Sequence, residues 1–262
     1  MKVVILAGGL GTRIAEYTNL IPKPMIEIGG RPILWHIMNI YSSYGFNDFV
    51  IALGFKSEVI KEYFLNYYSL NSDFEVDLSN GHINYLDEKI NKWKVSLIDT
   101  GLHSMTGGRI KRLEKTIKKE TFMVTYGDAV SNINIVELFK HHRKNKKLAT
   151  ITAVHPPARF GELTTDESGT VTAFKEKPQT KLGWINGGFF VFEPEIFSYI
   201  KDESTVLEKE PLETLANEKQ LISFYHSDFW QSMDSVRDKN FLEEIWAKGN
   251  APWIIKENLY EK

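Results

Sequence analysis

The chain has no cysteine among its 262 residues, and it lacks several other features that would place it in a special class. Without cysteine it has neither disulfides nor cysteine-ligated metals, and this composition suits a reducing cytoplasm. No apolar run approaches the roughly 18 residues of a membrane span, and the first run, Val3–Ala7, is too short for a secretion signal. The net charge of -2 includes no long basic block, which argues against nucleic-acid binding. We therefore expect a cytoplasmic protein that binds neither membranes nor nucleic acid.

Apolar segments of strand length alternate with helical patterns in the first half of the chain. Apolar residues make up 42% of the sequence, enough to fill a substantial core. The alternation predicts a Rossmann-like α/β fold with a mixed, mostly parallel central sheet flanked by helices. The expected strands are Lys2–Ala7, Asp48–Leu53, Val95–Asp99, Thr121–Tyr126 and Leu148–Val154. The expected helices are Pro32–Ser43, Ser57–Tyr68, Gly108–Ile117 and Asn134–Lys144.

One insertion and the second half of the chain have more β character. Phe74–Lys92 predicts a hairpin, because alternating stretches flank the turn Ser79-Asn80-Gly81. In the second half we expect a hairpin over Phe160–Glu176, a strand at Ile185–Phe192, and helices at Pro194–Ile200, Leu207–Asn217 and Val236–Lys248. We interpret residues 1–262 as one domain, with a nucleotide-binding part over about 1–154 and a smaller, β-rich part over about 155–262.

A glycine-rich loop follows the first expected strand. The loop is Gly8-Gly9-Leu10-Gly11-Thr12-Arg13, and Lys23-Pro24 comes after nine further residues. Glycines let backbone N–H groups approach a polyphosphate, and Arg13 and Lys23 add positive charge that binds phosphate oxygens. The loop is not a P-loop, since no Gly-Lys-Ser/Thr closes it, and it lacks the third glycine of the dinucleotide fingerprint. The sequence therefore predicts a site that holds a nucleoside triphosphate by its phosphates; the alternative is an ordinary βα turn.

Two aspartates are candidates for metal binding. Asp128 comes directly after an expected strand, and open α/β sheets bind ligands beyond the carboxyl ends of their strands. A carboxylate near a triphosphate is a natural Mg²⁺ ligand, although a turn aspartate is the alternative. Asp234 precedes an expected helix, and its spacing alone favours a helix N-cap over a metal ligand.

Two polar stretches in the second half could contact a substrate. Glu176-Lys177-Pro178 ends an expected strand and places a carboxylate beside an ammonium, with an exposed turn as the alternative. Asn186-Gly187-Gly188 interrupts an apolar strand, which indicates a bulge or a ligand that lies close to the backbone. The asparagine amide offers the donor and acceptor that sugar hydroxyls need. No Ser/His/Asp or Glu/Glu arrangement emerges, and we expect His36 and His103 to be structural.

Taken together, these motifs resemble those of the sugar nucleotidyltransferases and, among them, the cytidylyltransferases that act on glucose 1-phosphate. In the superfamily pattern, G-x-G-T-R is followed after nine residues by K-P. This chain has the pattern at Gly9–Arg13 and Lys23-Pro24. The cytidylyltransferase pattern extends over nearly the whole chain and is met at Lys23–His36, Asp99–Gly101, Ser104–Arg109, Tyr126–Asp128, Pro156–Gly161, Ile185–Phe190 and Phe229–Asp234. The departures are Ala129 and Ala158 in place of glycine and Ser232 in place of proline, none of which removes a charge.

The resemblance implies a role for each matched residue. CTP is expected to contact Leu6, Ala7, Gly8, Gly9, Leu10, Gly11, Thr12, Arg13, Lys23, Ser104, Arg109 and Asp128, with Arg13, Lys23 and Asp128 as the catalytic residues. One Mg²⁺ is expected between Asp128 and Asp234, and glucose 1-phosphate at Glu176, Lys177, Asn186 and Gly187. The implied products are CDP-glucose, for deoxysugar and surface-polysaccharide biosynthesis, and pyrophosphate. The resemblance also implies a homo-oligomer, with a hexamer as the expected state, and places sugar binding in the second part of the chain.

Three alternatives stay open at this stage. The chain could use another nucleoside triphosphate or sugar 1-phosphate, since the glycine loop is neutral about base and sugar. It could be a catalytically silent regulatory subunit, although a binding module need not keep both candidate metal carboxylates. A dinucleotide-dependent oxidoreductase is the third alternative, and the missing third glycine counts against it.

Overall fold

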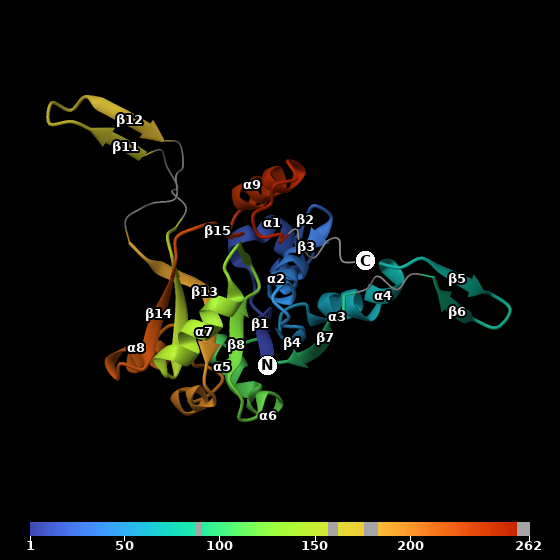
Figure 1. The fold of residues 1–262 in the computed structure, drawn as a ribbon. Coiled ribbons are helices and arrows are strands. Elements are labelled where there is room, and N and C mark those ends of the chain that lie inside the picture. The colour runs from blue at the N-terminus through green and yellow to red at the C-terminus, as the bar shows by residue number, and fades with distance from the viewer. Residues whose placement is uncertain (87–90, 157–161, 176–182, 256–262) are drawn as a thin grey trace.

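A seven-stranded mixed sheet forms the centre of the computed structural model, which describes residues 1–86, 91–156, 162–175 and 183–255 (Figure 1). The strand order is β14-β10-β13-β8-β1-β4-β7. Its strands are β1 (Lys2–Leu6), β4 (Asp48–Leu53), β7 (Lys94–Asp99), β8 (Phe122–Tyr126), β10 (Ala149–Val154), β13 (Ile185–Phe192) and β14 (Leu221–His226). Every neighbouring pair is parallel except those of β13, which runs antiparallel to both β8 and β10. The predicted mostly parallel α/β sheet is confirmed.

Side chains of the inner strands alternate between two apolar cores, one on each face of the sheet. On β1, Val3 and Ile5 belong to one core, whereas Val4 and Leu6 belong to the other. Inner strands covered on both faces read as continuous apolar runs. For this reason the sequence located six of the seven strands to within one residue at each end, and missed only the edge strand β14.

Helices cover both faces of the sheet (Figure 1). The first core includes side chains from α2, α3, α7 and α9, and the second includes side chains from α5, α6, α8 and the 3₁₀ helix η3. The α-helices are α1 (Ala15–Thr18), α2 (Ile33–Ser42), α3 (Ser57–Leu65), α4 (Tyr67–Leu70), α5 (Thr106–Arg112), α6 (Glu114–Ile117), α7 (Ile135–Asn145), α8 (Glu210–Asn217) and α9 (Val236–Ala247). The 3₁₀ helices are η1 (Thr12–Ile14), η2 (Lys23–Met25) and η3 (Pro194–Tyr199).

Several helix predictions differ from the structure. The helix expected over Ser57–Tyr68 breaks at Asn66, and the one expected over Gly108–Ile117 begins two residues earlier and breaks at Leu113. The helix expected from Leu207 begins only at Glu210, because the backbone of Lys209 is not helical, with φ −102° and ψ −120°. Such interruptions depend on tertiary contacts, which no helical periodicity records.

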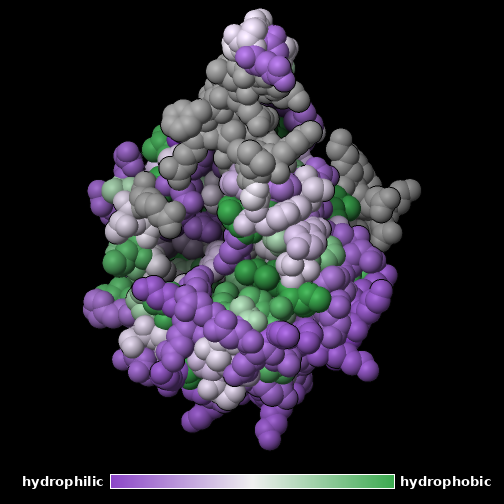
Figure 2. Space-filling view, turned by 90° about the vertical axis from the view of Figure 1, so that its left-hand side faces the viewer, coloured by the Kyte–Doolittle hydropathy of each residue, from purple (hydrophilic) through white to green (hydrophobic). Residues whose placement is uncertain are grey.

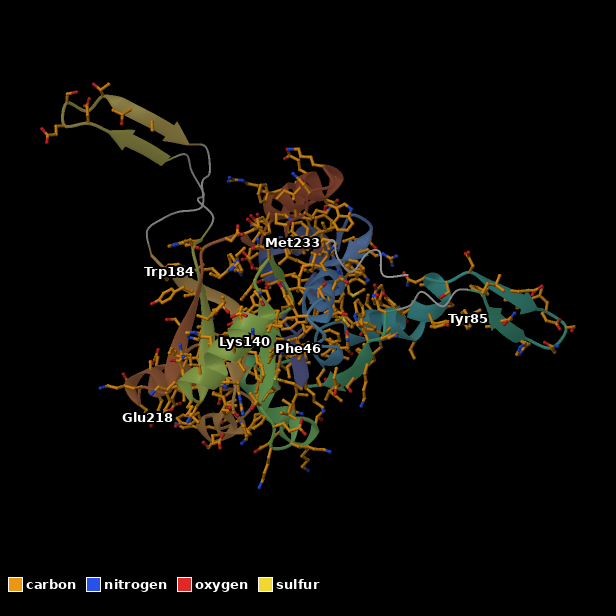
Figure 3. The ribbon with its side chains drawn as sticks, viewed as in Figure 1. Phe46, Tyr85, Lys140, Trp184, Glu218 and Met233 are labelled. Carbon is orange, nitrogen blue, oxygen red and sulfur yellow. The ribbon has the colours of Figure 1, made fainter. Side chains whose placement is uncertain are left out.

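Two hairpin arms extend from the body on opposite sides (Figure 1). One consists of β5 (Phe74–Asp77) and β6 (His82–Tyr85), and the other of β11 (Glu162–Thr165) and β12 (Val171–Lys175). Figure 3 shows Tyr85 at the inner end of the first arm, where β6 ends. Both predicted hairpins are therefore present, although residues 160, 161 and 176, which the second prediction includes, lie outside the described part of the chain.

Short ladders, which the sequence did not predict, bring loop residues together. They pair β2 (Glu27–Ile28) with β3 (Arg31–Pro32), and β9 (Ala129–Ser131) with β15 (Trp230–Ser232). Two or three residues are too few to show an alternating pattern. Strands from both predicted parts of the chain share the central sheet, and the division near residue 154 stays a prediction. Among the described helices, none has the length and apolar character to cross a membrane.

Candidate active site

A cavity of about 780 Å³ lies where β1 and β8 end and where β13 begins. Most of the predicted site residues line it. These are Leu6, Ala7, Gly8, Gly9, Leu10, Gly11, Thr12, Lys23, Ser104, Arg109, Asp128, Asn186 and Asp234. Ligands of open α/β sheets bind beyond the carboxyl ends of the strands, and this cavity has that position.

Four predicted residues do not line the described cavity wall. Glu176 and Lys177 lie outside the described residues, and of Arg13 the structure describes only the backbone, in η1. Gly187 is not among the described lining residues: its carbonyl accepts from the Trp230 indole at 2.8 Å, and a Cβ on it would lie 2.7 Å from Val154. Its predicted contact with the sugar stays a prediction.

At one end of the cavity the Lys23 ammonium bridges two carboxylates, and we call this the ionic end. Its Nζ donates to Asp128 at 2.6 Å and to Asp234 at 2.7 Å, although the three residues are far apart in sequence. Burial alone lowers the pKa of Lys23, but the two carboxylates outweigh burial and raise it above the usual value of 10.5. Lys23 is therefore a permanent cation at the cavity wall.

The β9–β15 ladder brings the two aspartates together. Ala129 pairs with Ser232, and the Met233 N–H donates to the Asp128 carbonyl at 2.8 Å. Met233 lies near the middle of the molecule (Figure 3). The helix-cap interpretation of Asp234 is wrong, because the N-cap of α9 is Ser235, whose side chain accepts from the Asp238 N–H. The Asp234 carboxylate instead lines the cavity, where the Ser232 hydroxyl donates to it at 3.1 Å.

The ionic end has a donor set that fits a magnesium ion. Two carboxylate oxygens converge on one cation, and the Lys23 ammonium stands where a metal would meet them. Within the described ranges no three His, Cys, Asp or Glu side chains cluster as metal ligands. A magnesium ion bound by Asp128 and Asp234 would complete its octahedron with water and substrate phosphates, which is its usual mode in phosphoryl-transfer sites.

Arg109 supports the glycine loop from behind. Its guanidinium is buried and donates to the carbonyls of Gly8, Leu53 and Gly101 at 2.8–3.1 Å. A Cβ on Gly8 would lie 2.2 Å from this guanidinium, so Gly8 leaves room for the arginine, and its predicted contact with phosphate stays a prediction. No pattern along the chain could reveal this role, since the three carbonyls belong to separate segments. The predicted contact of Arg109 with a nucleotide stays a prediction.

A second group of cavity-lining side chains is held by hydrogen bonds, and we call it the hydrogen-bonded end. The Tyr126 hydroxyl donates to the Glu208 carboxylate and accepts from the Asn186 amide at 3.0 Å. Burial and, after it, the charge of Glu208 raise the pKa of Tyr126, so this phenol stays protonated. All three side chains line the cavity. The sequence predicts Asn186 at the site but not Glu208, because the charged run Glu208-Lys209-Glu210 falls within the helix expected over Leu207–Asn217.

His36 is structural, as predicted. Its Nδ1 accepts from the Trp253 indole at 3.2 Å, so its Nε2 carries the proton and donates to the Ile28 carbonyl at 2.8 Å. Burial lowers the pKa of His36 to about 4, which keeps the ring neutral. His103, by contrast, lines the cavity.

Comparison with known proteins identifies the family. The model of the family described as nucleotidyl transferase matches residues 2–236. The chain belongs to the nucleotidyl transferase family. Among members of this family, a glucose-1-phosphate cytidylyltransferase of Salmonella typhi is 49% identical over 97% of this chain and 98% of its own. A probable glucose-1-phosphate cytidylyltransferase of Bacillus subtilis is 43% identical over 97% of this chain and 100% of its own.

The resemblance predicted from the motifs is thus confirmed. The nucleotidyl transferase fold is also found in solved structures. The crystal structure of HddC from Yersinia pseudotuberculosis superimposes with a TM-score of 0.67 and 24% identity, over 94% of this chain and 99% of that one. At this level of identity the likeness concerns the fold alone.

Proposed function

We propose that this protein transfers CMP from CTP to α-D-glucose 1-phosphate and releases CDP-glucose and pyrophosphate. The observation that carries the proposal is the ionic end of the cavity, where Lys23, Asp128 and Asp234 converge beside the glycine loop. The two cytidylyltransferase relatives, which align over almost the whole chain, support the choice of CTP and glucose 1-phosphate. We further propose that CDP-glucose serves deoxysugar and surface-polysaccharide synthesis in the cytoplasm.

In the proposed reaction a phosphate oxygen of glucose 1-phosphate attacks the α-phosphorus of CTP in line, and pyrophosphate leaves. The nucleophile is already an anion, so the reaction needs no general base, and the described cavity wall offers no Ser/His/Asp arrangement. The main barrier is repulsion between two polyanions, which fixed cations reduce most effectively. Lys23 supplies one such cation, and Arg13 is proposed to supply another.

A magnesium ion held by Asp128 and Asp234 would neutralise phosphate charge during this transfer. Lys23 then has a second task. When its ammonium no longer meets the two carboxylates, it can donate to the phosphate oxygens that enter beside the glycine loop. We assign catalytic roles to Arg13, Lys23 and Asp128, metal binding to Asp128 and Asp234, and sugar contacts to Glu176, Lys177 and Asn186. Ser104, which is buried at the cavity wall, is assigned to the nucleotide.

We also propose that the protein is a homo-oligomer. The first arm and the end of α4 before it expose a set of apolar side chains that no part of the described body covers: Leu70, Phe74, Val76, Leu78, Ile83 and Leu86. An isolated hairpin with such a surface is marginal in water, whereas a second copy of the chain could cover it. At the base of the other arm, the exposed Trp184 stacks on His155 with centroids 3.8 Å apart (Figure 3). Seen from the side of β14 and α8, the surface is mostly hydrophilic, with apolar residues near its centre (Figure 2).

The decisive experiment measures pyrophosphate release from the purified protein with magnesium, over several nucleoside triphosphates and several hexose 1-phosphates. We expect release with CTP and glucose 1-phosphate well above every other pair. Activity confined to a different pair would replace the proposed substrates. No release with any pair would contradict an enzymatic role and favour a regulatory subunit that binds nucleotide sugars. Size-exclusion chromatography with light scattering tests the oligomer, and a monomer would contradict it.

A further inference from the structure

Glu208 joins two walls of the cavity that are remote in sequence. It lies just before α8, and its two carboxylate oxygens accept from different hydroxyls. One oxygen accepts from Thr106, the first residue of α5, at 2.6 Å, and the other accepts from Tyr126, the last residue of β8. Among the side chains that the structure describes, no lysine, arginine or histidine forms an ion pair with Glu208. Within the described part of the chain, the partners of this carboxylate are therefore hydroxyl donors.

The Glu208 carboxylate determines the direction of every hydrogen bond in this group. An ionised carboxylate can only accept, so the Tyr126 hydroxyl must donate its single proton to it. The same hydroxyl oxygen must then accept from the Asn186 amide at 3.0 Å. The Asn186 carbonyl accepts from the Gly188 backbone N–H at 2.9 Å, which independently fixes the same amide orientation. One N–H and one lone pair of the Asn186 amide are left for a ligand.

The position of a negative charge also indicates which part of the ligand binds here. A carboxylate whose described partners are two hydroxyls would repel a phosphate group, whereas hydroxyl groups of a sugar or ribose can donate to it. Phosphates are accommodated at the ionic end, near Lys23. The hydrogen-bonded end therefore suits the neutral, hydroxyl-rich part of a substrate.

We propose that Glu208 is a positioning residue for the sugar, which acts through Tyr126 to fix the Asn186 amide and so sets both sugar affinity and the choice among hexose 1-phosphates. This inference rests on the proposed function, because it assumes that a hexose 1-phosphate binds beside Asn186. It adds a residue and a chain of contacts, Glu208 to Tyr126 to Asn186, that determine how the sugar is recognised.

The test is the variant Glu208→Gln. A glutamine has one acceptor oxygen, so its NH₂ group must face one of the two hydroxyls that now donate to it. The Thr106 hydroxyl already accepts from the Leu207 N–H and keeps its donor direction, which leaves the NH₂ group facing Tyr126. The Tyr126 oxygen then receives two donors, and its contact with the Asn186 NH₂ group, one of the two that hold this amide, is weakened. We expect KM for glucose 1-phosphate to rise about tenfold, with kcat and the Kd of CTP changed less than about twofold.

A double-mutant cycle separates positioning from a general structural effect. In a Tyr126→Phe background the chain of contacts from Glu208 to Asn186 is already broken. Adding Glu208→Gln should therefore change KM for glucose 1-phosphate by less than about twofold. Wild-type protein should also discriminate glucose 1-phosphate from its galactose and mannose counterparts more strongly than Glu208→Gln does. Glu213→Gln, an exposed glutamate on α8, is the matched control and should behave as wild type.

Each contrary outcome has a distinct meaning. If wild type turns over glucose 1-phosphate and Glu208→Gln leaves its KM and sugar selectivity unchanged, the inference is wrong while the proposed function stands. A loss of CTP affinity as large as the loss for the sugar would also refute it, since Glu208 would then act on the nucleotide through Thr106. If Glu208→Gln also raises KM for glucose 1-phosphate tenfold in the Tyr126→Phe background, Glu208 does not act through Tyr126, and the proposed chain of contacts is refuted. If the wild-type protein releases no pyrophosphate with any of the hexose 1-phosphates, the proposed function fails and this inference fails with it.

Discussion

The two ends of the cavity are organised by different physics. At the ionic end one ammonium holds two carboxylates within 2.7 Å, whereas the hydrogen-bonded end has a single carboxylate surrounded by neutral donors. Charge acts over distance and tolerates small changes in geometry, so the ionic end suits a metal ion and the phosphates of any nucleotide. Hydrogen bonds depend on direction, so the other end suits selection among sugars that differ by one hydroxyl. We therefore propose that the ionic end governs rate and the hydrogen-bonded end governs the choice of sugar.

The largest expected effect is on turnover at the ionic end. We expect Lys23→Ala and Asp128→Asn each to lower kcat by about 100-fold or more, the usual loss when a preorganised charge at the reacting phosphate is removed. Steady-state pyrophosphate release measures it, with circular dichroism to show that the fold is intact. Lys115→Ala, an exposed lysine on α6, is the control. Near-wild-type turnover in either variant would contradict the site assignment.

A glycine at the hydrogen-bonded end gives the next largest effect. Gly188 has φ +78°, and a Cβ there would lie 2.3 Å from the Tyr126 ring. Gly183 has φ +80° with open space around it, so its change to alanine introduces the same backbone strain without the steric clash. We expect Gly188→Ala to lower the free energy of unfolding by about 1–3 kcal/mol more than Gly183→Ala does, measured by urea denaturation. Equal losses would show that Tyr126 is not held against this strand.

Metal affinity should depend on the second carboxylate of the ionic end. Removing one of two charged ligands weakens a magnesium site, and we expect Asp234→Asn to raise the half-saturating magnesium concentration at least about tenfold, equivalent to about 1.4 kcal/mol. Titration of pyrophosphate release with magnesium measures this, and Mn²⁺ binding followed by electron paramagnetic resonance gives a second readout without turnover. Asp73→Asn, at an exposed position before β5, is the control. An unchanged magnesium dependence would remove Asp234 from the metal site.

The smallest expected effect is a pH dependence from Tyr126. Its pKa is raised in the folded protein, so above pH 10 the unfolded chain releases a proton that the folded chain keeps. The folded state then binds more protons, and its stability falls as pH rises. Between pH 9 and pH 11 the stability advantage of wild type over Tyr126→Phe should shrink by about 1.4 kcal/mol. Urea denaturation at both pH values measures it, with the exposed Tyr225→Phe as control; a constant difference would contradict a buried, protonated Tyr126.

The residues of the glycine loop could be predicted because they are close together in sequence. The glycine loop follows an inner strand whose continuous apolar run is easily recognised, and Lys23 follows at a spacing typical of the family. Asp128 lines the cavity, as predicted, because it comes two residues after the end of β8. Glu208 could not be predicted, since it belongs to a short loop without periodicity and meets its partners only after folding.

The amino-acid sequence alone determined the α/β class, the inner strands, the phosphate loop and the family resemblance, because each depends on residues close together along the chain. Only the tertiary structure decided which distant residues meet. The β9–β15 ladder turned Asp234 from an expected helix cap into the partner of Lys23, and it placed Asp128 beside it. Burial of Arg109 behind Gly8 and the contacts of Glu208 with Thr106 and Tyr126 were decided in the same way. The physical reason is that buried polar groups must find hydrogen-bonding partners, and only the fold determines which partners lie within reach.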